Sequence, residues 1–422
     1  MKIKKLLAFA LALALVPMLT LFAACENSKT DPPPDISSEE ESSPEPSAPA
    51  GEPIKIGHIV DLTGSEALTG EEAARALQFA VDTLGGEIAG HPVEIIIGDA
   101  QGQTSVAADV ARKMVEQDGV AAVFGPTQAG QKAAVSEYIK DAGVPLIFYN
   151  GSPSGLFLSN EWLVGAGGAN AQMPSVMADY AYNALGYRNV HTLTMDNVGF
   201  RSFTDYFAEF NTALGGSVAS DQYAPLPCAD WAPYFSTMKD ADAIMAWSTG
   251  SDAIAMWTAW HEMGIGDRMP VTAVLHGAFT DYFILNALSH SSPATAEAVL
   301  GTIAPTMYVY DVQTPENIAF VEAWTEEFGA IPQTNLPGLC YQAYLLFHTA
   351  AEAIGGDTDP GKLIEAIFAA DINGPAGHLF FSDSHAATKD VYVVKTVQLA
   401  DGSYNYEIVK EYKDVPPDGL AP

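Results

Sequence analysis

Basic residues are scarce in this chain. Its 19 Lys and Arg stand against 52 Asp and Glu, which gives a formal net charge of −33 at pH 7. A surface of this sign repels polyanions and anionic lipid headgroups, so nucleic acid and direct adhesion to a membrane surface are excluded. The hydrophobic fraction of 48% over 422 residues still predicts a folded protein with two domains or one large one.

Cysteine is also rare, with Cys25, Cys228 and Cys340 as the only three. Cys25 follows an N-terminal apolar run, so two cysteines remain for the folded body. An exported location permits a disulfide between Cys228 and Cys340. Their spacing alone does not decide between that bridge and two buried thiols, and two thiols are the simpler expectation.

The sequence lacks the common motifs of enzymes and of cofactor sites. It has no GxxxxGK[ST] phosphate loop, and GAGGAN at 165–170 misses the last glycine of a dinucleotide fingerprint. The segment 151–155 has proline where a nucleophile elbow needs serine. The nine histidines show no metal-ligand spacing with the cysteines. We therefore expect no enzymatic activity, no cofactor and no metal site.

The first 25 residues have the pattern of an export signal. Three lysines precede an apolar run from 6 to 24, which ends in LFAA before Cys25. A run of this length could also span a membrane as an anchor. Its N-terminal position and the small residues before Cys25 resemble a lipoprotein signal peptide, although Phe22 stands where Leu, Val or Ile is usual. We expect residues 1–25 to be this signal and Cys25 to carry the lipid.

A segment of low hydrophobicity follows the expected signal. Residues 26–52 are rich in Pro, Ser and Glu and contain one Ile and no aromatic residue. Such a segment buries too little apolar surface to offset the entropy of ordering. We expect residues 26–52 to be a disordered tether for a folded body that begins near Pro53.

Apolar runs of strand length alternate with helical patterns from Pro53 onward. Strands that are apolar throughout and separated by helices are typical of a parallel sheet covered on both faces. The alternation occurs in two series, which predicts an α/β fold with two doubly wound parallel-sheet lobes. The expected strands are 54–60, 93–98, 120–125, 144–149, 190–195, 217–223, 242–247 and 271–276. The expected helices are 70–86, 104–117, 128–142, 172–186, 200–214, 231–239 and 251–264.

The C-terminal part has a different order of elements. A strand-like run at 301–310 precedes helical patterns at 315–328, 338–354 and 360–370. Two alternating segments then flank Asp401-Gly402, which is a hairpin signal.

Polar and glycine-rich loops follow the predicted strands. In open parallel sheets ligands bind at the carboxyl ends of the strands, where helix N-termini offer unpaired N–H groups and a positive dipole end. These loops suit a small polar or anionic ligand, although each alone could be an ordinary turn. They lie at 61–65, 125–130, 150–152, 196–199, 248–251 and 276–277.

Four segments, taken in order, resemble one known family. They are IKIGHIVDLTGSEALTGEEAARALQFAVDTLGG at 54–86, VAAVFGPTQAGQKAAVSEYIKDAGVPLI at 120–147, Leu185-Gly186-Tyr187, and INGPAG at 372–377. Over about 53–412 the chain is similar to the type I periplasmic solute-binding proteins of ABC importers, in the branch that includes the leucine/isoleucine/valine-binding protein. The resemblance implies two doubly wound lobes that close on a ligand about a hinge of three crossover strands.

The resemblance also implies where the lobes begin and end. The crossovers are expected near Leu163–Gly168, Gly301–Thr306 and Gly374–Phe381. Lobe 1 is then expected to comprise 53–166 with 304–377, and lobe 2 to comprise 167–303 with 378–412.

One position that holds the ligand carboxylate in the family falls on Ala129. The family's serine hydroxyl is therefore missing, and the resemblance implies that the backbone N–H groups of Ala129 and Gly130 bind the acid. Gln128 or Gln131 is expected to replace the hydroxyl.

A second carboxylate-binding position falls on Ser152. This residue keeps the hydroxyl that the family uses there, and it follows Asn150 and Gly151 directly. The resemblance implies that these three residues complete the site for the polar head of the ligand.

The lobe 2 positions depart further from the family. Phe200 and Thr249 stand where the family has tyrosines, and His276 falls near the acid that pairs with a ligand ammonium. Without this acidic side chain, the expected ligand is a carboxylate that lacks an amine, including an aromatic acid, rather than an α-amino acid. Tyr149 and Trp247 are nearby in sequence, either as walls of the site or as core residues.

These expectations predict a lipid-anchored solute receptor that feeds the permease of an ABC importer. It would be a monomer on the outer face of the cytoplasmic membrane, or on the periplasmic side of a membrane, and it would trap a small carboxylate or amino-acid-like ligand. A sensing module of the same fold that signals to a membrane partner is the alternative. An exported hydrolase that uses Ser152 is a third hypothesis.

Overall fold

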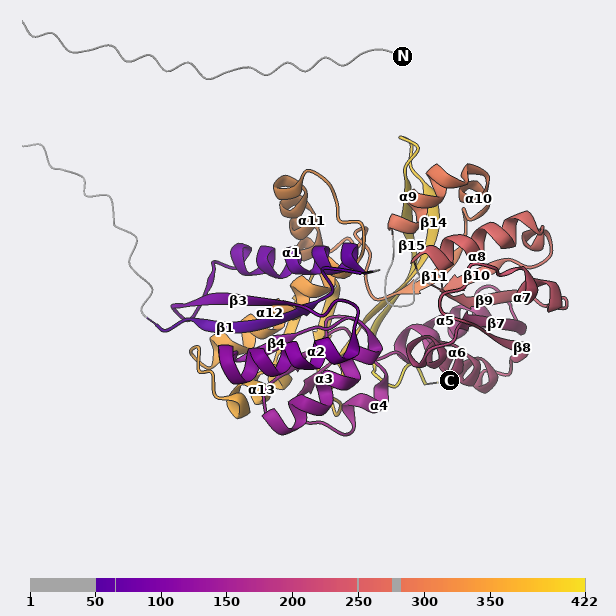
Figure 1. Ribbon diagram of the computed structural model, residues 1–422. Coiled ribbons are helices and arrows are strands. Elements are labelled where there is room, and N and C mark those ends of the chain that lie inside the picture. Colours follow the sequence, from indigo (N-terminus) through magenta and orange to yellow (C-terminus); the bar gives the residue numbers. More distant parts are fainter. Residues whose placement is uncertain (1–50, 65, 249, 275–281, 422) are drawn as a thin grey trace, which may run out of the picture. The chain divides into compact units, whose positions relative to one another are not determined.

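The computed structural model describes residues 51–421 except Ser65, Thr249 and 275–281. From Pro49 onward the chain forms one compact unit. Within the described residues the strands form three sheets, and the first two are each built from consecutive strands with helices between them (Figure 1).

The first sheet has six strands in the order β2-β3-β1-β4-β5-β6. Its strands pair in parallel except for the antiparallel β2 and β3. β1 is apolar and buried along most of its length because helices cover both faces of the sheet. The strands are β1 Ile54–Val60, β2 Glu87–Ile88, β3 His91–Asp99, β4 Ala122–Phe124, β5 Leu146–Ile147 and β6 Leu163–Val164. The helices are α1 Ala67–Thr83, α2 Thr104–Lys113, α3 Ala129–Ala142 and α4 Ser154–Phe157.

The second sheet has four parallel strands in the order β10-β9-β7-β8. β9 is buried at all five positions, as expected for a central strand covered on both faces. The strands are β7 Asn189–Met195, β8 Ser217–Ala224, β9 Ala243–Trp247 and β10 Val271–Val274. The helices are α5 Gln172–Asn183, α6 Val198–Ala213, α7 Ala232–Thr237, α8 Gly250–Glu262, α9 Tyr282–Ser291 and α10 Pro293–Ala298. These two sheets confirm the predicted α/β fold with two doubly wound parts.

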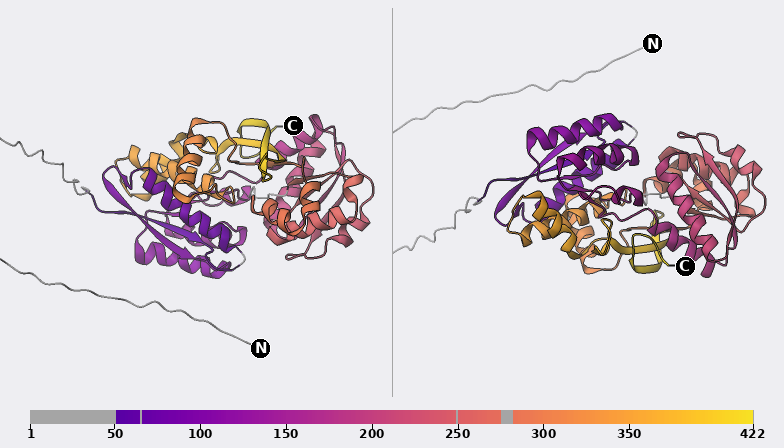
Figure 2. Two further views of the ribbon diagram at one scale, coloured as in Figure 1. Left: turned by 90° about the horizontal axis from the view of Figure 1, so that it is seen from above. Right: turned by 90° about the horizontal axis from the view of Figure 1, so that it is seen from below.

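The third sheet is antiparallel and holds the C-terminal strands. β14 pairs with β11, β13 and β15, and β12 pairs with β13. The strands are β11 Ile303–Thr306, β12 Asp371–Gly374, β13 Gly377–Phe380, β14 Thr388–Gln398 and β15 Tyr404–Val415. The helices of this part are α11 Pro315–Phe328, α12 Leu336–Ala353 and α13 Pro360–Ala369. The views in Figures 1 and 2 agree that these helices lie beside the first sheet, and α12 packs against α1.

The third sheet contacts elements of both parallel-sheet parts. α12 packs against β12, whereas α5 packs against β11 and β14 and α9 packs against β15. Beside the first expected crossover, the Gly165 N–H donates to His385 O over 2.7 Å and the Ala387 N–H donates to Gly165 O over 3.0 Å. The segment that runs along this crossover is therefore 385–387.

Residues 374–381, expected as a third crossover, form a hairpin in the structure. These residues form most of the β12–β13 hairpin, in which Gly374 is paired with Gly377. Gly377 has a φ of +89°, a conformation that glycine adopts without the steric cost of a side chain. Gly374 and Gly377 of INGPAG thus serve a tight turn.

The strand expected at 301–310 is also shorter than predicted. β11 ends at Thr306, whose hydroxyl donates to Tyr308 O over 3.0 Å and accepts from Tyr308 N over 3.3 Å. Such side-chain bonds to the backbone compete with ladder pairing and end the strand. α9 and α10 were not expected at all, whereas α3, α11 and the β14–β15 hairpin lie within a few residues of the prediction.

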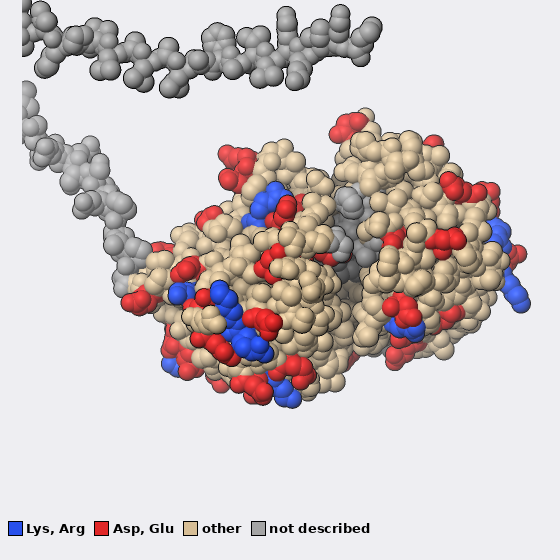
Figure 3. All heavy atoms as spheres, viewed as in Figure 1, with Lys and Arg blue, Asp and Glu red and all other residues tan. Residues whose placement is uncertain are grey.

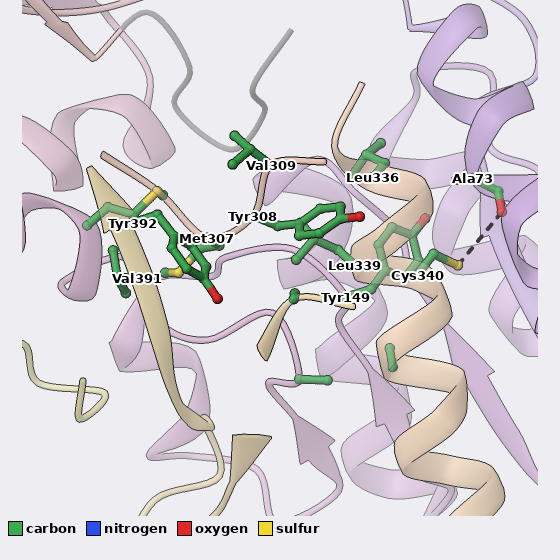
Figure 4. Close-up of a cluster of buried hydrophobic side chains, with 14 of the residues drawn as sticks. Ala73, Tyr149, Met307, Tyr308, Val309, Leu336, Leu339, Cys340, Val391 and Tyr392 are labelled. Carbon is green, nitrogen blue, oxygen red and sulfur yellow. Dashed lines mark hydrogen bonds between the residues drawn. The ribbon is translucent and has the colours of Figure 1, made fainter. Parts of the chain in front are cut away.

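A cluster of buried side chains joins α12 to the segment after β11 and to β14 (Figure 4). Tyr308 and Tyr392 are fully buried there, and the Cys340 thiol points to Ala73 O at 3.7 Å. Cys340 and Cys228 are both free and buried. The expectation of two buried thiols is confirmed.

Negative charge is spread over the face shown in Figure 3, where acidic side chains outnumber basic ones. This distribution agrees with the excess of Asp and Glu in the sequence. Among the described residues no helix combines the length and the apolar character that a bilayer crossing requires.

Candidate ligand-binding site

The candidate site lies at the carboxyl edge of the first sheet. β4 and β5 are paired, so the loops that follow them are neighbours at this edge. The loop after β4 leads into α3, and the loop after β5 contains residues 150–152, which we call the binding loop. Ligands of open parallel sheets bind at such an edge.

Asp61, which follows β1, organises the start of α3. Its carboxylate is 1% exposed and accepts hydrogen bonds from Gln128 Nε2 and Gln131 Nε2, each over 2.8 Å. It also accepts from the Gly102 N–H over 2.7 Å. Both glutamine nitrogens face the carboxylate, so the Gln131 Oε1 atom faces elsewhere, buried and without a partner among the described residues.

α3 begins without a side-chain cap. Gln128 is its N-cap residue, but its side chain accepts no bond from the first turn, because the Gln128 amide is directed to Asp61, and no other side chain of the described residues caps this turn. Ala129 is partly exposed and Gly130 is exposed. An uncapped helix N-terminus presents unpaired N–H groups and the positive end of the helix dipole, and both attract an anion.

Lys132 lies one turn further along α3 and is 1% exposed. Its Nζ donates to Asn150 O over 3.1 Å, to Gly151 O over 2.8 Å and to the Ser152 hydroxyl over 2.9 Å. Burial lowers the pKa of this ammonium well below its usual range. Lys132 therefore fixes the binding loop from the side of α3 that is buried. The fully buried Ser152 hydroxyl is one of its acceptors.

Two buried amide oxygens flank Gly151. The Asn150 amide donates to Thr127 O over 3.1 Å, which leaves its Oδ1 without a partner among the described residues. The Asn170 amide donates to the Ser202 hydroxyl over 2.9 Å, and its Oδ1 is likewise unpaired there and lies 3.0 Å from a Cβ built on Gly151. A buried acceptor without a donor is unfavourable, so these oxygens suit a ligand that carries N–H or O–H groups.

The N-terminus of α6 approaches the N-terminus of α3. A Cβ atom built on Gly199 would lie 3.3 Å from the Cβ of Ala129. Asn197 caps α6 by accepting from the Phe200 N–H over 2.9 Å, and Val198 is 77% exposed. Two positive dipole ends at this distance repel each other, and an anion between them removes the repulsion.

The aromatic residues considered for the site have different surroundings. Phe200 is partly buried against the core at the start of α6. Trp247 is fully buried and stacks on Phe203 with ring centroids 4.6 Å apart, so it is a core residue. Tyr149 is 1% exposed and its hydroxyl lies 3.3 Å from His58 Nε2.

The structure thus brings seven of the predicted site residues to one region. They are Gln128, Ala129, Gly130, Asn150, Gly151, Ser152 and Phe200. Thr249 and His276 lie outside the described residues. In the part of the chain that the structure describes, no group of three or more His, Cys, Asp or Glu residues has the arrangement of a metal site.

Sequence reasoning missed Lys132 and Asn170. Lys132 has helical spacing with the buried residues Ser136 and Ile139 of α3, and this spacing was the available signal. Asn170 belongs to a glycine-rich segment that was weighed only as a dinucleotide fingerprint, and no spacing in the sequence connects it with Ser202.

The sequence and fold of this chain match one known protein family. The profile of the periplasmic binding protein family matches residues 53–403, and this chain belongs to that family. Members of the family are extracytoplasmic solute-binding proteins and not enzymes. The chain is a substrate-binding protein of the Leu/Ile/Val type that serves ABC transporters.

Three similar proteins illustrate the range of the family. Leu/Ile/Val-binding protein homolog 6 of Brucella melitensis is 23% identical over 383 residues, which cover 89% of this chain and 95% of the relative. The structure of an ABC transporter substrate-binding protein from Sphaerobacter thermophilus has a TM-score of 0.79 and 29% identity, and covers 86% of this chain and 99% of that one. A solute-binding protein from Rhodopseudomonas palustris BisB5, solved with 3,4-dihydroxybenzoic acid, has a TM-score of 0.76 and 23% identity, with 86% and 98% covered.

Proposed function

We propose that this chain is an exported, lipid-anchored receptor that traps a small carboxylate between two lobes and delivers it to an ABC importer. The observation that carries the proposal is the approach of the α3 and α6 N-termini, with Ala129 next to Gly199. The free N–H groups of α3 would bind the carboxylate, and the N-terminus of α6 would meet it from the other side.

The polar head of the ligand would contact the predicted residues Gln128, Ala129, Gly130, Asn150 and Gly151. Ser152 would act through the loop backbone, because its hydroxyl already accepts from Lys132. Phe200, Thr249 and His276 would contact the ligand from lobe 2.

The ligand would also carry a hydrogen-bond donor. The unpaired oxygens of Asn150 and Asn170 support this part of the proposal, because both need an N–H or O–H partner. An amino acid supplies an ammonium, and a hydroxy acid supplies a hydroxyl. The names of similar proteins contain both kinds of ligand, Leu/Ile/Val in one and 3,4-dihydroxybenzoic acid in another.

The ligand would work by shifting a conformational equilibrium. Only a ligand that binds the closed form more tightly than the open form can close the lobes. The binding loop is well placed to couple the two events, because Ser152 and Ala169 form a bridge next to the first crossover. The Asn170 N–H donates to Ser152 O over 2.9 Å in the same place.

Thermal unfolding of the purified chain with two ligand sets tests the proposal. One set contains leucine, isoleucine and valine, and the other contains benzoate, 4-hydroxybenzoate and 3,4-dihydroxybenzoate. A ligand at 1,000 times its Kd adds about 4 kcal/mol, which is about 5 °C in Tm for a body of this size. The proposal predicts a rise with at least one acid and none with glucose, and no rise with either set contradicts it.

Transport is tested separately in cells. Deletion of the gene should abolish uptake of the acid that stabilises the purified chain. Normal uptake together with loss of a transcriptional response to the same acid would instead identify a sensing module.

A further inference from the structure

Lys132 is a buried amine whose three hydrogen bonds all go to neutral oxygens, and its Nζ also lies 5.0 Å from the centroid of the Phe148 ring. Its Nζ contacts Asn150 O, Gly151 O and the Ser152 hydroxyl, and no carboxylate of the described residues forms an ion pair with it. Lys389 is also 1% exposed, but its neighbour Asp390 brings a carboxylate to that region. A buried ammonium without a counter-ion is costly, so the site of Lys132 favours an anion.

The contacts of Lys132 also set the direction of the binding loop. In a planar trans peptide the C=O and the following N–H point in opposite directions. Because the carbonyls of Asn150 and Gly151 face Lys132, the N–H groups of Gly151 and Ser152 point away from it. The Ser152 N–H donates to Gly168 O over 3.3 Å, whereas the Gly151 N–H has no partner among the described residues.

We propose that Lys132 is the specificity-determining charge of this site, which makes the binding loop select a carboxylate over an uncharged ligand. The Gly151 N–H and the first N–H groups of α3 bind the acid, and Lys132 attracts it from behind the loop. This inference rests on the proposed function, since it concerns the same ligand.

The expected size of the effect follows from Coulomb attraction. Two unit charges about 7 Å apart at an effective dielectric constant of about 20 attract each other enough to change affinity roughly 50-fold. Asp61 is an opposing charge near the start of α3, where it accepts from Gly102, Gln128 and Gln131, but it is present in the unmodified chain and in the Lys132 variants alike, so it does not alter the comparison between them. If Lys132 only fixed the loop in place, the site would not bind an acid more tightly than the matching uncharged amide.

Substitutions of Lys132 separate the effect of its charge from the effect of its hydrogen bonds to the binding loop. Lys132→Gln keeps a donor for the loop oxygens and removes the charge, and Lys132→Met fills a similar volume without either property. Lys140→Gln is the matched control, because Lys140 lies on the same helix and is exposed. Circular dichroism confirms that each full-length variant is folded.

Isothermal titration then compares each acid with its carboxamide. The probes are leucine with leucinamide, benzoate with benzamide, and 4-hydroxybenzoate with 4-hydroxybenzamide. We expect the unmodified chain and Lys140→Gln to prefer the acid by about 50-fold. Lys132→Gln should weaken the acid by a similar factor and change the amide by less than about threefold.

Two outcomes would overturn the role of Lys132 alone. One is that Lys132→Gln keeps the preference, or weakens acid and amide equally. The other is that the unmodified chain binds acid and amide with the same affinity, which needs no variant at all. If the unmodified chain binds none of the acids, both the carboxylate specificity of the proposed function and the role of Lys132 are overturned.

Discussion

At the scale of single residues, the site depends on polar groups that are buried and oriented by neighbours. Asp61 is the main example, since its carboxylate accepts from Gly102, Gln128 and Gln131. Gly70 allows α1 to approach it closely, because a Cβ there would lie 2.0 Å from Asp61 O. The direction of both glutamine side chains, and hence of the Gln131 oxygen, follows from this one acid.

Replacement of Asp61 by Asn should weaken both the fold and the site. The new amide group would face a donor that Asp61 now accepts from, and an unsatisfied buried donor costs about 1–3 kcal/mol. We expect the free energy of unfolding in urea to fall by that amount and acid binding to weaken about 10-fold. Asp82→Asn is the control, because Asp82 accepts from Gln78 over 2.9 Å on the exposed side of α1. Equal effects of the two substitutions would contradict the role given to Asp61.

His58 makes stability depend on pH. Burial lowers its pKa from 6.5 to about 3, and its Nδ1 has no partner among the described residues. The unfolded chain therefore binds the proton more readily, so the contribution of neutral His58 is present above pH 6.5 and is lost as the pH falls toward 3.

A difference measurement isolates this contribution. His58→Gln cannot titrate, so between pH 6 and pH 5 the unmodified chain should lose about 1 kcal/mol more of its unfolding free energy than the variant. Buried acids such as Glu72, whose pKa is raised by burial, contribute equally to both proteins and cancel. His290→Gln, at an exposed position, should behave as the unmodified chain. Identical pH slopes in His58→Gln and the unmodified chain would contradict the assignment.

Residue types alone could predict only part of this site. Gln128, Ala129 and Asn150 follow from the loop positions, because loops after parallel strands must meet at one edge. Lys132 could not be assigned to the binding loop, since its three contacts depend on how β5 places residues 150–152. Asn170 and Ser202 are brought together by folding, and their separation in the sequence does not predict the hydrogen bond between them.

At the scale of elements, the first crossover supports the binding loop. The Gly167 N–H donates to Phe148 O over 2.8 Å, and a Cβ on Gly167 would lie 2.4 Å from backbone atoms of Asn150. Real Cβ atoms do not tolerate such distances, so the two segments can be this close only with glycine at this position.

Gly167→Ala should therefore move the binding loop. We expect acid binding to weaken at least 10-fold and the free energy of unfolding to fall by about 1–3 kcal/mol, as for overpacking in other cores. Gly155→Ala is the matched control, since a Cβ there meets nothing within 4 Å. The account of this crossover fails if the Gly167 variant binds acids as tightly as the control variant, measured by titration calorimetry.

Elements with strong periodicity were predictable, and turns that depend on single bonds were not. The helices α3 and α11 carry clear apolar spacing and end at glycines, Gly143 and Gly329, so their bounds were close. The β12–β13 hairpin was missed because INGPAG was interpreted through the family's crossover rather than through the turn that Gly377 permits. The early end of β11 depends on the hydrogen bond of the Thr306 hydroxyl to Tyr308 O, and no sequence pattern predicts this bond.

At the scale of the whole molecule, the proposal of a lipid anchor rests on the sequence around Cys25. Replacement of this residue by Ala should abolish labelling by palmitate and leave the signal uncleaved, so the chain should migrate as a larger species. Cys228→Ala is the control, because Cys228 is buried and free in the folded body. Labelling that persists without Cys25, or an uncleaved chain before any substitution, would contradict lipidation and favour a spanning anchor.

The central claim is that a small carboxylate is held at the N-terminus of α3, against the binding loop. A crystal structure of the chain with the acid that stabilises it most tests this claim directly. The account predicts carboxylate oxygens within hydrogen-bond distance of the N–H groups of Ala129, Gly130 and Gly151, with Lys132 still behind the loop. A ligand whose carboxylate contacts none of these N–H groups would contradict it.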